Sequence, residues 1–209
     1  MTIKPRIGII ISTTRKARFA DKPAQWLLDL ARQRDDADFE IVDLRDYPMP
    51  FFDEDQSPVW VPPANAAAQA WGRKMAELDG YVVITAEYNH SMSGVLKNAL
   101  DYAYAEYNRK PVTFVGYGGL GASRAVEQLR QVFAELQVAS LKHTVHINTP
   151  ELIGLMRDGK SFADFPYLAA SAEIMLDDLV WWTNVLSEGR RAVPAAVFDP
   201  AKALAAAGA

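Results

Sequence analysis

Cysteine is absent from the 209-residue sequence. Its absence excludes disulfides, thiolate metal sites, iron–sulfur clusters and a cysteine nucleophile. It also agrees with a cytoplasmic location, where disulfides are rare.

The sequence has little excess charge and no long apolar run. The formal net charge is −4 and no cluster of basic residues occurs, so nucleic acids and acidic membranes are not expected as partners. The apolar run from Ile7 to Ile11 is too short for the core of a signal peptide. No apolar stretch of about 18 residues, the length that spans a membrane, occurs elsewhere.

Two kinds of catalytic site are also missing. No G-x-S-x-G segment is present, which leaves an α/β-hydrolase without its nucleophile. Only three histidines occur, and two of them, His143 and His146, are three residues apart on a predicted strand. Such side chains point to opposite faces of the strand and are not suited to hold one metal ion, so we predict no metal site.

What is present is the composition of one soluble domain. Half of the residues are hydrophobic and 23% are charged, as in ordinary globular proteins. We predict a single domain over residues 1–190. The Ala-rich end, residues 191–209, shows no clear period and is predicted to be a loose tail or an arm that contacts a partner.

Patterns of buried strands alternate with patterns of amphipathic helices. The predicted strands are Ile7–Ile11, Phe39–Leu44, Tyr81–Thr85, Val112–Val115 and Leu141–Ile147. The predicted helices are Ala20–Arg34, Asn65–Leu78, Ser93–Tyr104, Ser123–Leu136 and Tyr167–Leu186. This alternation is typical of βαβ units and a parallel sheet. It fits a doubly wound α/β sheet, flavodoxin-like or Rossmann-like, in which ligands bind at the carboxyl ends of the strands.

The loop after the first strand, Ser12 to Arg18, combines three hydroxyl side chains with two arginines. It precedes a helix, whose first N–H groups favour an anion, and arginine binds phosphate through paired hydrogen bonds. The loop lacks the lysine and glycines of a P-loop, so a nucleoside triphosphate is not favoured. The pattern indicates a phosphate site. The alternative is a capped helix start followed by solvated basic residues.

The loop after the third strand, Ala86 to Ser91, is densely polar although the strand before it is buried. Backbone amides, an amide side chain and an aromatic wall would suit the hydrogen-bonding edge of an isoalloxazine ring. Asn89 and Ser91 would equally suit a turn and a helix cap.

The loop after the fourth strand, Gly116 to Gly121, literally matches the G-x-G-x-x-G dinucleotide pattern. That fingerprint belongs after the first strand, with an acid about 20 residues later, and neither condition holds here. We interpret the glycines as letting backbone N–H groups approach a flat ring without Cβ clashes. Ordinary turn glycines are the alternative.

Together the three loops resemble the NAD(P)H-dependent FMN reductase family, a flavodoxin-like group that includes quinone, azo and chromate reductases. The resemblance spans about residues 6–147. The residues that carry it are Glu87-Tyr88-Asn89, Ser91, Gly94, Leu96-Lys97-Asn98-Ala99, Asp101, Gly118-Gly119, and Asp43-Leu44-Arg45 with Pro48 and Pro50.

This resemblance implies a flavodoxin-like three-layer sandwich with a five-stranded parallel sheet of order 2-1-3-4-5. It implies FMN as cofactor, NADPH or NADH as co-substrate and a small-molecule electron acceptor. The implied phosphate contacts are Thr13, Arg15 and Arg18. The implied contacts to the ring and ribityl chain are Glu87, Tyr88, Asn89 and Ser91, and those at the pyrimidine end are Tyr117, Gly118 and Gly119. No catalytic side chain is predicted because the flavin carries the chemistry.

Three positions depart from the family pattern. Ser12 stands where a glycine is common, and Ala86 and Ser93 stand where prolines are usual. The first change is expected to shift phosphate contacts and the other two to soften the flavin loop. The alternative function is a non-enzymatic FMN-binding electron carrier or regulatory protein. The acceptor and the choice between NADH and NADPH stay open.

Aromatic residues favour an oligomer. The helix that starts at Ser93 is expected to continue through Tyr102, Tyr104 and Tyr107, and the last helix carries adjacent tryptophans, Trp181 and Trp182. Neighbouring side chains on a helix point about 100° apart, so both tryptophans are hard to bury in one small core. Aromatics are enriched at interfaces, and the family resemblance implies a homodimer or homotetramer.

Overall fold

Long runs of buried β-branched and aromatic residues form the middle of the structure. The computed structural model describes residues 4–193. In β1 (Arg6–Ile11) five buried residues follow Arg6, and every residue of β3 (Gly80–Ala86) and β4 (Pro111–Tyr117) is buried. Strands that are apolar on both faces are typical of a parallel sheet covered by helices on each side.

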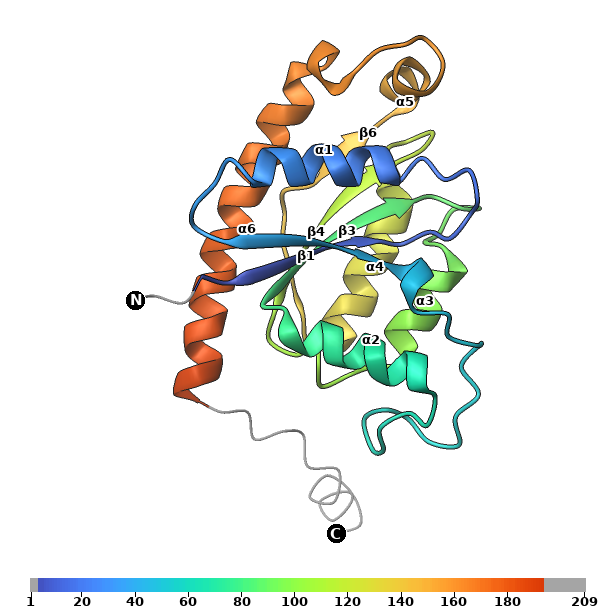
Figure 1. Ribbon diagram of the computed structural model, residues 1–209, viewed down its shortest axis with the longest axis vertical. Helices are drawn as coiled ribbons and strands as arrows, with labels where there is room; N and C mark the ends of the chain where they lie inside the picture. The colour runs from blue at the N-terminus through green and yellow to red at the C-terminus, as the bar shows by residue number, and fades with distance from the viewer. Residues whose placement is uncertain (1–3, 194–209) are drawn as a thin grey trace.

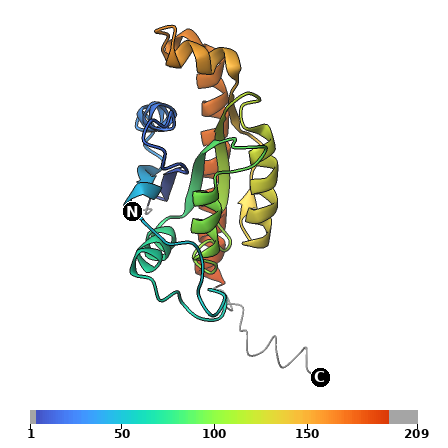
Figure 2. The ribbon, with the colours of Figure 1, turned by 90° about the vertical axis from the view of Figure 1, so that its right-hand side faces the viewer.

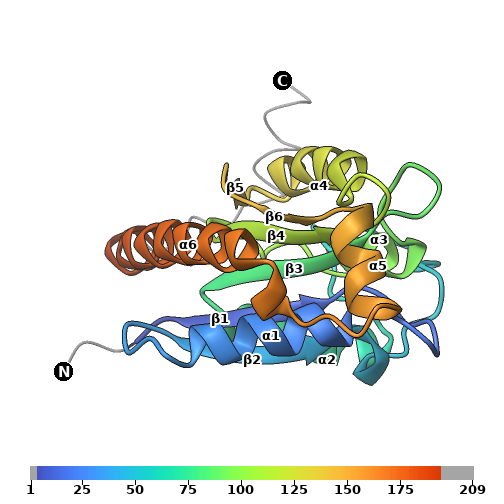
Figure 3. The ribbon, with the colours of Figure 1, turned by 90° about the horizontal axis from the view of Figure 1, so that it is seen from above.

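The strands lie in the order β2-β1-β3-β4-β5, and all of them pair in parallel. Here β2 is Asp38–Asp43, at one edge of the sheet. Seen from above, the strands follow one another from β2 to β6, with α1 and α6 in front of them (Figure 3). This confirms the flavodoxin-like three-layer sandwich and its strand order.

Alternate residues of each strand pack against different helix layers. Ile9 belongs to the core under α1 (Asp21–Ala31) and α6 (Pro166–Ala192). Ile10 belongs to the opposite core, which is completed by three helices, α2 (Ala66–Glu77), α3 (Gly94–Asp101) and α4 (Ser123–Glu135). Helices on both faces leave the carboxyl edge of the sheet, on the right in Figure 1, to the loops.

The predicted fifth strand is interrupted. In this part of the chain two short strands pair with β4, β5 (Ala139–Ser140), which lies before the predicted strand, and β6 (Val145–Ile147), at its end. Between them the Thr113 hydroxyl donates to the His143 carbonyl at 2.5 Å, and the Arg130 guanidinium binds the carbonyls of Leu141 and Lys142. Side chains therefore take over carbonyl groups that a continuous ladder would use, which is why the unbroken strand was a wrong prediction.

The helix from Ser93 also ends earlier than predicted. It stops at Asp101, and the chain then turns, so that Tyr102 and Tyr107 enter the core at 1% and 0% exposure. The Tyr107 hydroxyl accepts a hydrogen bond from the Trp71 indole at 2.7 Å. These two tyrosines are core residues, and their use as evidence for an interface was wrong.

A further helix, α5 (Thr149–Met156), follows β6 and was not predicted. Two short 3₁₀ segments, η1 (Leu44–Asp46) and η2 (Phe162–Asp164), complete the elements. The last helix extends to Ala192, across the boundary predicted at residue 190, and most of the predicted tail, 194–209, lies outside the described residues. Among residues 4–193, no helix is long and apolar enough to cross a bilayer.

Gly116 lies in β4 where the chain passes very close to the loop that follows it. A Cβ at this position would lie 2.2 Å from the Gly121 carbonyl oxygen. We expect Gly116→Ala to lower the free energy of unfolding by about 1–3 kcal/mol, because backbone must shift to relieve the overlap. Urea denaturation measures this.

The control is Gly189→Ala in α6, where an added Cβ meets nothing within 4 Å. Alanine favours a helix more than glycine, so this variant should gain about 0.5–1 kcal/mol. A Gly116→Ala protein as stable as the unmodified chain would contradict the packing described here.

Candidate functional site

Three loops meet at the carboxyl edge of the sheet, which faces the viewer in Figure 2. They are the β1–α1 loop, the β3–α3 loop and the β4–α4 loop, defined here as residues 12–20, 87–93 and 118–122. They are the loops in which the sequence predicted a site, and the parallel order of β1, β3 and β4 brings them together.

Backbone carbonyls of the β1–α1 loop are bound by side chains, two from outside the loop and one, Arg18, from within it. The Ser12 carbonyl accepts from the Ser93 hydroxyl at 2.5 Å, and the Thr13 carbonyl accepts from Arg18 at 2.7 Å. Arg45 of η1 donates to two more, those of Arg15 and Lys16. Two of the residues that depart from the family pattern, Ser12 and Ser93, are thus hydrogen-bonded to each other.

The backbone N–H groups of this loop differ from its carbonyls in their hydrogen bonding. Within residues 4–193 the N–H groups from Thr14 to Ala17 donate no hydrogen bond. The carbonyls of Ser12, Thr13, Arg15 and Lys16 are held in place while these N–H groups stay available, which is the arrangement of a backbone anion site. A negatively charged group would fit this arrangement.

Arg18 holds the β1–α1 loop in this shape. Its side chain is 2% exposed and donates to Asp43 at the end of β2, to Asp21 in the first turn of α1, and to the Thr13 carbonyl. The hydrogen bonding that Arg18 donates to the Asp43 carboxylate is the main cause that raises the pKa of Arg18. All of these bonds are internal to the protein, so the predicted phosphate contact of Arg18 stays a prediction.

Arg15 and Thr13 keep donors free. The Arg15 guanidinium is exposed and has no polar partner among the described residues, and it lies 6.0 Å from the centre of the Tyr88 ring. The Thr13 hydroxyl is fully buried and makes no hydrogen bond of good geometry within residues 4–193. It lies near the Tyr117 hydroxyl, and this contact opposes the rise that burial causes in the pKa of Tyr117. A buried hydroxyl without a well-formed hydrogen bond is costly, which makes it available to a ligand atom.

The β3–α3 loop begins with a two-residue hairpin. Tyr88 and Ser91 exchange two backbone hydrogen bonds, of 2.9 and 3.1 Å. Between them Asn89 and His90 have φ values of 49° and 76°, in the left-handed region. A turn of this type favours asparagine and glycine, so His90 is the less suited of the two residues, and such strain gathers at functional sites. Asn89 and His90 are both exposed at the edge.

Side chains of α4 hold this hairpin from outside. Arg124 forms an ion pair with the Glu87 carboxylate, which is 6% exposed and also accepts from the Arg124 amide at 3.3 Å. Gln128 accepts from the Ser91 hydroxyl at 2.5 Å and donates to the His90 carbonyl at 3.0 Å. Neither of these two residues of α4 was predicted from the sequence. Their spacing of four, which places them on one helix face, was the only available signal.

The β4–α4 loop presents glycine backbone to the same edge. Gly118 and Gly121 have positive φ values, 149° and 56°, and the Gly119 carbonyl accepts from Thr149 at 3.1 Å. A Cβ on Gly119 would meet nothing within 4 Å, so the space beside it is open. Burial raises the pKa of Tyr117 to about 12, so its hydroxyl remains protonated at neutral pH.

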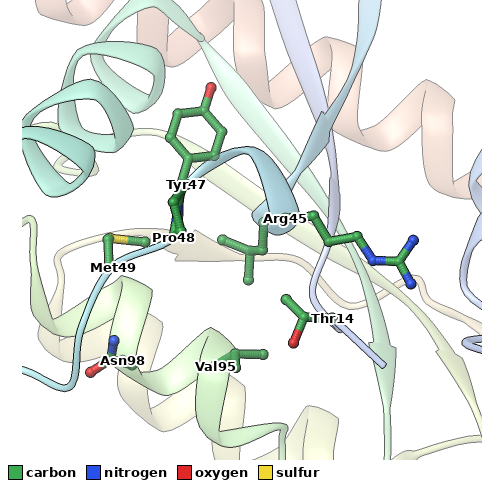
Figure 4. Close-up of a pocket in the computed structure, with 8 residues that line it drawn as sticks. Thr14, Arg45, Tyr47, Pro48, Met49, Val95 and Asn98 are labelled. Atoms are coloured by element: carbon green, nitrogen blue, oxygen red, sulfur yellow. The ribbon is translucent and has the colours of Figure 1, made fainter. Parts of the chain in front are cut away.

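A pocket of about 330 Å³ adjoins the β1–α1 loop on the side of β2 (Figure 4). Its apolar lining comes from four residues, Leu44, Pro48, Met49 and Val95. Thr14 borders it, whereas the side chains of Arg45 and Tyr47 point away. Asn98 holds the segment that follows Pro48 and Met49 in place, because its carboxamide donates to the Pro50 carbonyl at 2.7 Å and accepts from the Phe52 amide at 2.9 Å.

The arrangement combines an anion site, an open glycine backbone and an apolar pocket. It would bind a planar molecule that carries a phosphate. No three His, Asp or Glu side chains among the described residues gather as metal ligands. His90 is an exposed turn residue, and its side chain makes no hydrogen bond within residues 4–193.

Comparisons with known proteins agree with this geometry. The family model described as NADPH-dependent FMN reductase matches residues 5–151. An NAD(P)H-dependent FMN reductase of Schizosaccharomyces pombe is 36% identical over 143 residues, which cover 66% of this chain and 72% of the relative. A 2-hydroxy-1,4-benzoquinone reductase of a Burkholderia species is 32% identical over 154 residues, covering 70% and 76%.

A solved structure has the same fold. The flavoenzyme NAD(P)H:(acceptor) oxidoreductase of Paracoccus denitrificans aligns with a TM-score of 0.68 at 21% identity, over 86% of this chain and 97% of that one. At this identity the likeness supports the fold alone. The family match confirms the resemblance that the three loops carry.

The Arg18–Asp43 ion pair should contribute to stability. We expect Arg18→Ala to lower the free energy of unfolding by about 2–3 kcal/mol at pH 7, because it leaves a partly buried carboxylate without its cation. Burial raises the pKa of Asp43, but hydrogen bonds from Arg18 and the Arg45 amide lower it further, and the net pKa lies below 3.8. The ion pair therefore contributes to the free energy of unfolding above pH 3.8, and this contribution is lost as the pH falls through the lowered pKa of Asp43.

Urea denaturation between pH 3 and 7 measures this. The difference between Arg18→Ala and the unmodified chain should shrink below pH 3.8. Arg32→Ala is the control, since Arg32 is 66% exposed and 4.0 Å from Asp29, and should change little. An equal effect of the two substitutions would contradict the role of Arg18.

Proposed function

The chain belongs to the NADPH-dependent FMN reductase family, and we propose that it reduces quinones and similar small acceptors with FMN bound at the carboxyl edge of its sheet. Family membership makes it an oxidoreductase with FMN as cofactor and NAD(P)H as reductant. The proposal includes a cytoplasmic location, in agreement with the absence of cysteine.

The observation that carries this proposal is the contrast within the β1–α1 loop between bound carbonyls and free amides. A phosphate monoester would receive hydrogen bonds from the amides of Thr14 to Ala17, from the buried Thr13 hydroxyl and from the free Arg15 guanidinium. Arg18 is proposed to act mainly by holding the β1–α1 loop in its shape, because its donors already bind carboxylates and a carbonyl.

The other two loops would take the isoalloxazine ring. Tyr88 and Asn89 are proposed to contact it with their side chains. The Glu87 carboxylate and the Ser91 hydroxyl already bind α4, so these two residues would contribute through the backbone. Tyr117, Gly118 and Gly119 are proposed to lie at the pyrimidine end, where the open space beside Gly119 admits a flat ring.

When bound, FMN would supply the transfer of two electrons from the nicotinamide to the acceptor. The residues bind and orient the ring, and no side chain has to act as an acid or base. The loops would contact the phosphate and the ring edge, and they would not cover both ring faces. Quinone is the acceptor we favour, because a relative is a quinone reductase and the pocket beside Thr14 is lined by apolar side chains.

We also propose a homodimer or homotetramer. The outer face of α6 carries four exposed apolar residues, Tyr167, Ile174, Trp181 and Val185, at 52, 55, 59 and 44% exposure. The first three are seven residues apart and lie on one face, as in helices that pack against a partner. Trp182 is half-buried against the core, so of the two tryptophans Trp181 carries this proposal.

Turnover is expected to be ping-pong with broad acceptor tolerance. Nicotinamide and acceptor must approach the same open ring face, and two planar molecules cannot occupy it together. Initial rates with NADPH and a benzoquinone both varied should give parallel double-reciprocal lines. Intersecting lines would contradict the shared site. FMN binding without NADH or NADPH oxidation would instead indicate an electron carrier.

Arg15→Ala should weaken FMN binding by about 10- to 100-fold, the range expected for a charged hydrogen bond. The thermal midpoint of the apoprotein should stay the same, because Arg15 has no internal polar partner among the described residues. Titration of apoprotein by flavin fluorescence measures the affinity. Arg15→Lys keeps the charge but not the fork geometry and should lose part of the affinity. Unchanged affinity in both variants would show that Arg15 is a solvated surface residue.

Trp181→Glu should dissociate the oligomer, because it places a charge in the centre of the apolar stripe. Light scattering at micromolar concentration should give at least twice the 23.1 kDa chain mass for the unmodified protein and 23.1 kDa for the variant. Gln131→Glu adds the same charge at an exposed position of α4 and should stay assembled. A monomeric unmodified protein would refute the proposed interface.

A further inference from the structure

Gln128 makes two hydrogen bonds across a gap of nearly 40 residues in sequence. Its carboxamide oxygen accepts from the Ser91 hydroxyl at 2.5 Å, and its nitrogen donates to the His90 carbonyl at 3.0 Å. One planar group thus binds the last two residues of the β3–α3 hairpin turn. Gln128 itself lies on α4, whose buried side chains anchor it in the core.

The turn that Gln128 binds needs such support. Asn89 and His90 both adopt left-handed backbone angles. Asparagine tolerates this conformation, whereas histidine does so less readily than glycine. The two backbone bonds between Tyr88 and Ser91 close the hairpin but leave its orientation relative to the sheet undefined. Contacts from another element must set that orientation.

The same helix face also holds the start of the loop. Arg124, one turn before Gln128, forms an ion pair with Glu87. The two contacts bracket the hairpin at residue 87 and at residues 90–91. Because α4 also begins directly after the β4–α4 loop, its position relates the two loops that we propose to hold the ring.

We infer that Gln128 is a positioning residue for the flavin, which fixes the Asn89–His90 turn in the conformation that presents backbone N–H groups to the ring edge. The inference rests on the proposed function. A turn that is only partly populated in the binding conformation lowers the apparent affinity by that fraction. Loss of two neutral hydrogen bonds predicts about 5- to 30-fold weaker FMN binding.

The experiment uses four variants of the full chain: Gln128→Ala, Gln128→Met, Ser91→Ala and the double variant Ser91→Ala/Gln128→Ala. Methionine keeps the length and helix preference of glutamine without its hydrogen bonds, so it covers the case in which alanine impairs folding. Gln131→Ala, at an exposed position of the same helix, is the control. Apoprotein is titrated with FMN, and amide hydrogen exchange is measured over residues 88–91.

Gln128→Ala and Gln128→Met should bind FMN about 5- to 30-fold more weakly and exchange the Ser91 amide faster, with an unchanged thermal midpoint. The double variant should bind FMN within twofold of Gln128→Ala, because both substitutions remove the same contact between Ser91 and Gln128.

The reduced ring carries negative charge, so loss of N–H donors should weaken binding of the reduced ring more than binding of the oxidised ring. The flavin midpoint potential should fall, by about 30 mV for each tenfold difference.

Two results would overturn the inference and leave the proposed function intact. One is normal FMN affinity and potential in both Gln128 variants. The other is additive loss in the double variant, which would separate Gln128 from the turn. Failure of the unmodified chain to bind FMN would overturn the proposed function and this inference together.

Discussion

The ion pair between Arg18 and Asp43 is the contact on which the edge of the sheet depends. It joins the β1–α1 loop to the end of β2 and places a cation, 2% exposed, behind the loop. From there Arg18 binds the Thr13 carbonyl, and Arg45, whose amide is bound by the same Asp43, reaches two further carbonyls. With the carbonyls held, the N–H groups of the loop stay available to an anion.

The second constraint comes from α4, which follows the β4–α4 loop in the chain and whose side chains bind the β3–α3 loop. Arg124 and Gln128 reach back to the β3–α3 loop, and Gly118, in the loop before the helix, lies beside Glu87. The edge is therefore supported by two separate sets of contacts, one from β2 for the phosphate and one from α4 for the ring. Each set includes side chains from outside the loop that it shapes, Asp43 and Arg45 for the first and Arg124 and Gln128 for the second. This explains why a short polar loop can keep a strained turn.

The sequence predicted the parts that depend on local pattern. Buried runs such as Ile7–Ile11 and the regular alternation with helices predicted the sheet and the location of the site at its carboxyl edge. Roles that depend on a distant partner could not be predicted. The hydrogen bond from Arg18 to Asp43, 25 residues away, has no signature in the sequence of the loop. Gln128 reads as an ordinary polar helix residue until the packing of α4 turns it toward Ser91. Thr113 and Arg130 likewise interrupt a strand whose own residues favour continuity.

The central claim is that the β1–α1 loop binds the phosphate of FMN. Titration of the apoprotein with FMN and with riboflavin, which has the same ring and no phosphate, tests it most directly. The free amides, the Thr13 hydroxyl and the Arg15 guanidinium predict that FMN binds at least about 100-fold more tightly, since several hydrogen bonds to a charged group are lost together. Equal affinity for the two flavins would contradict the account.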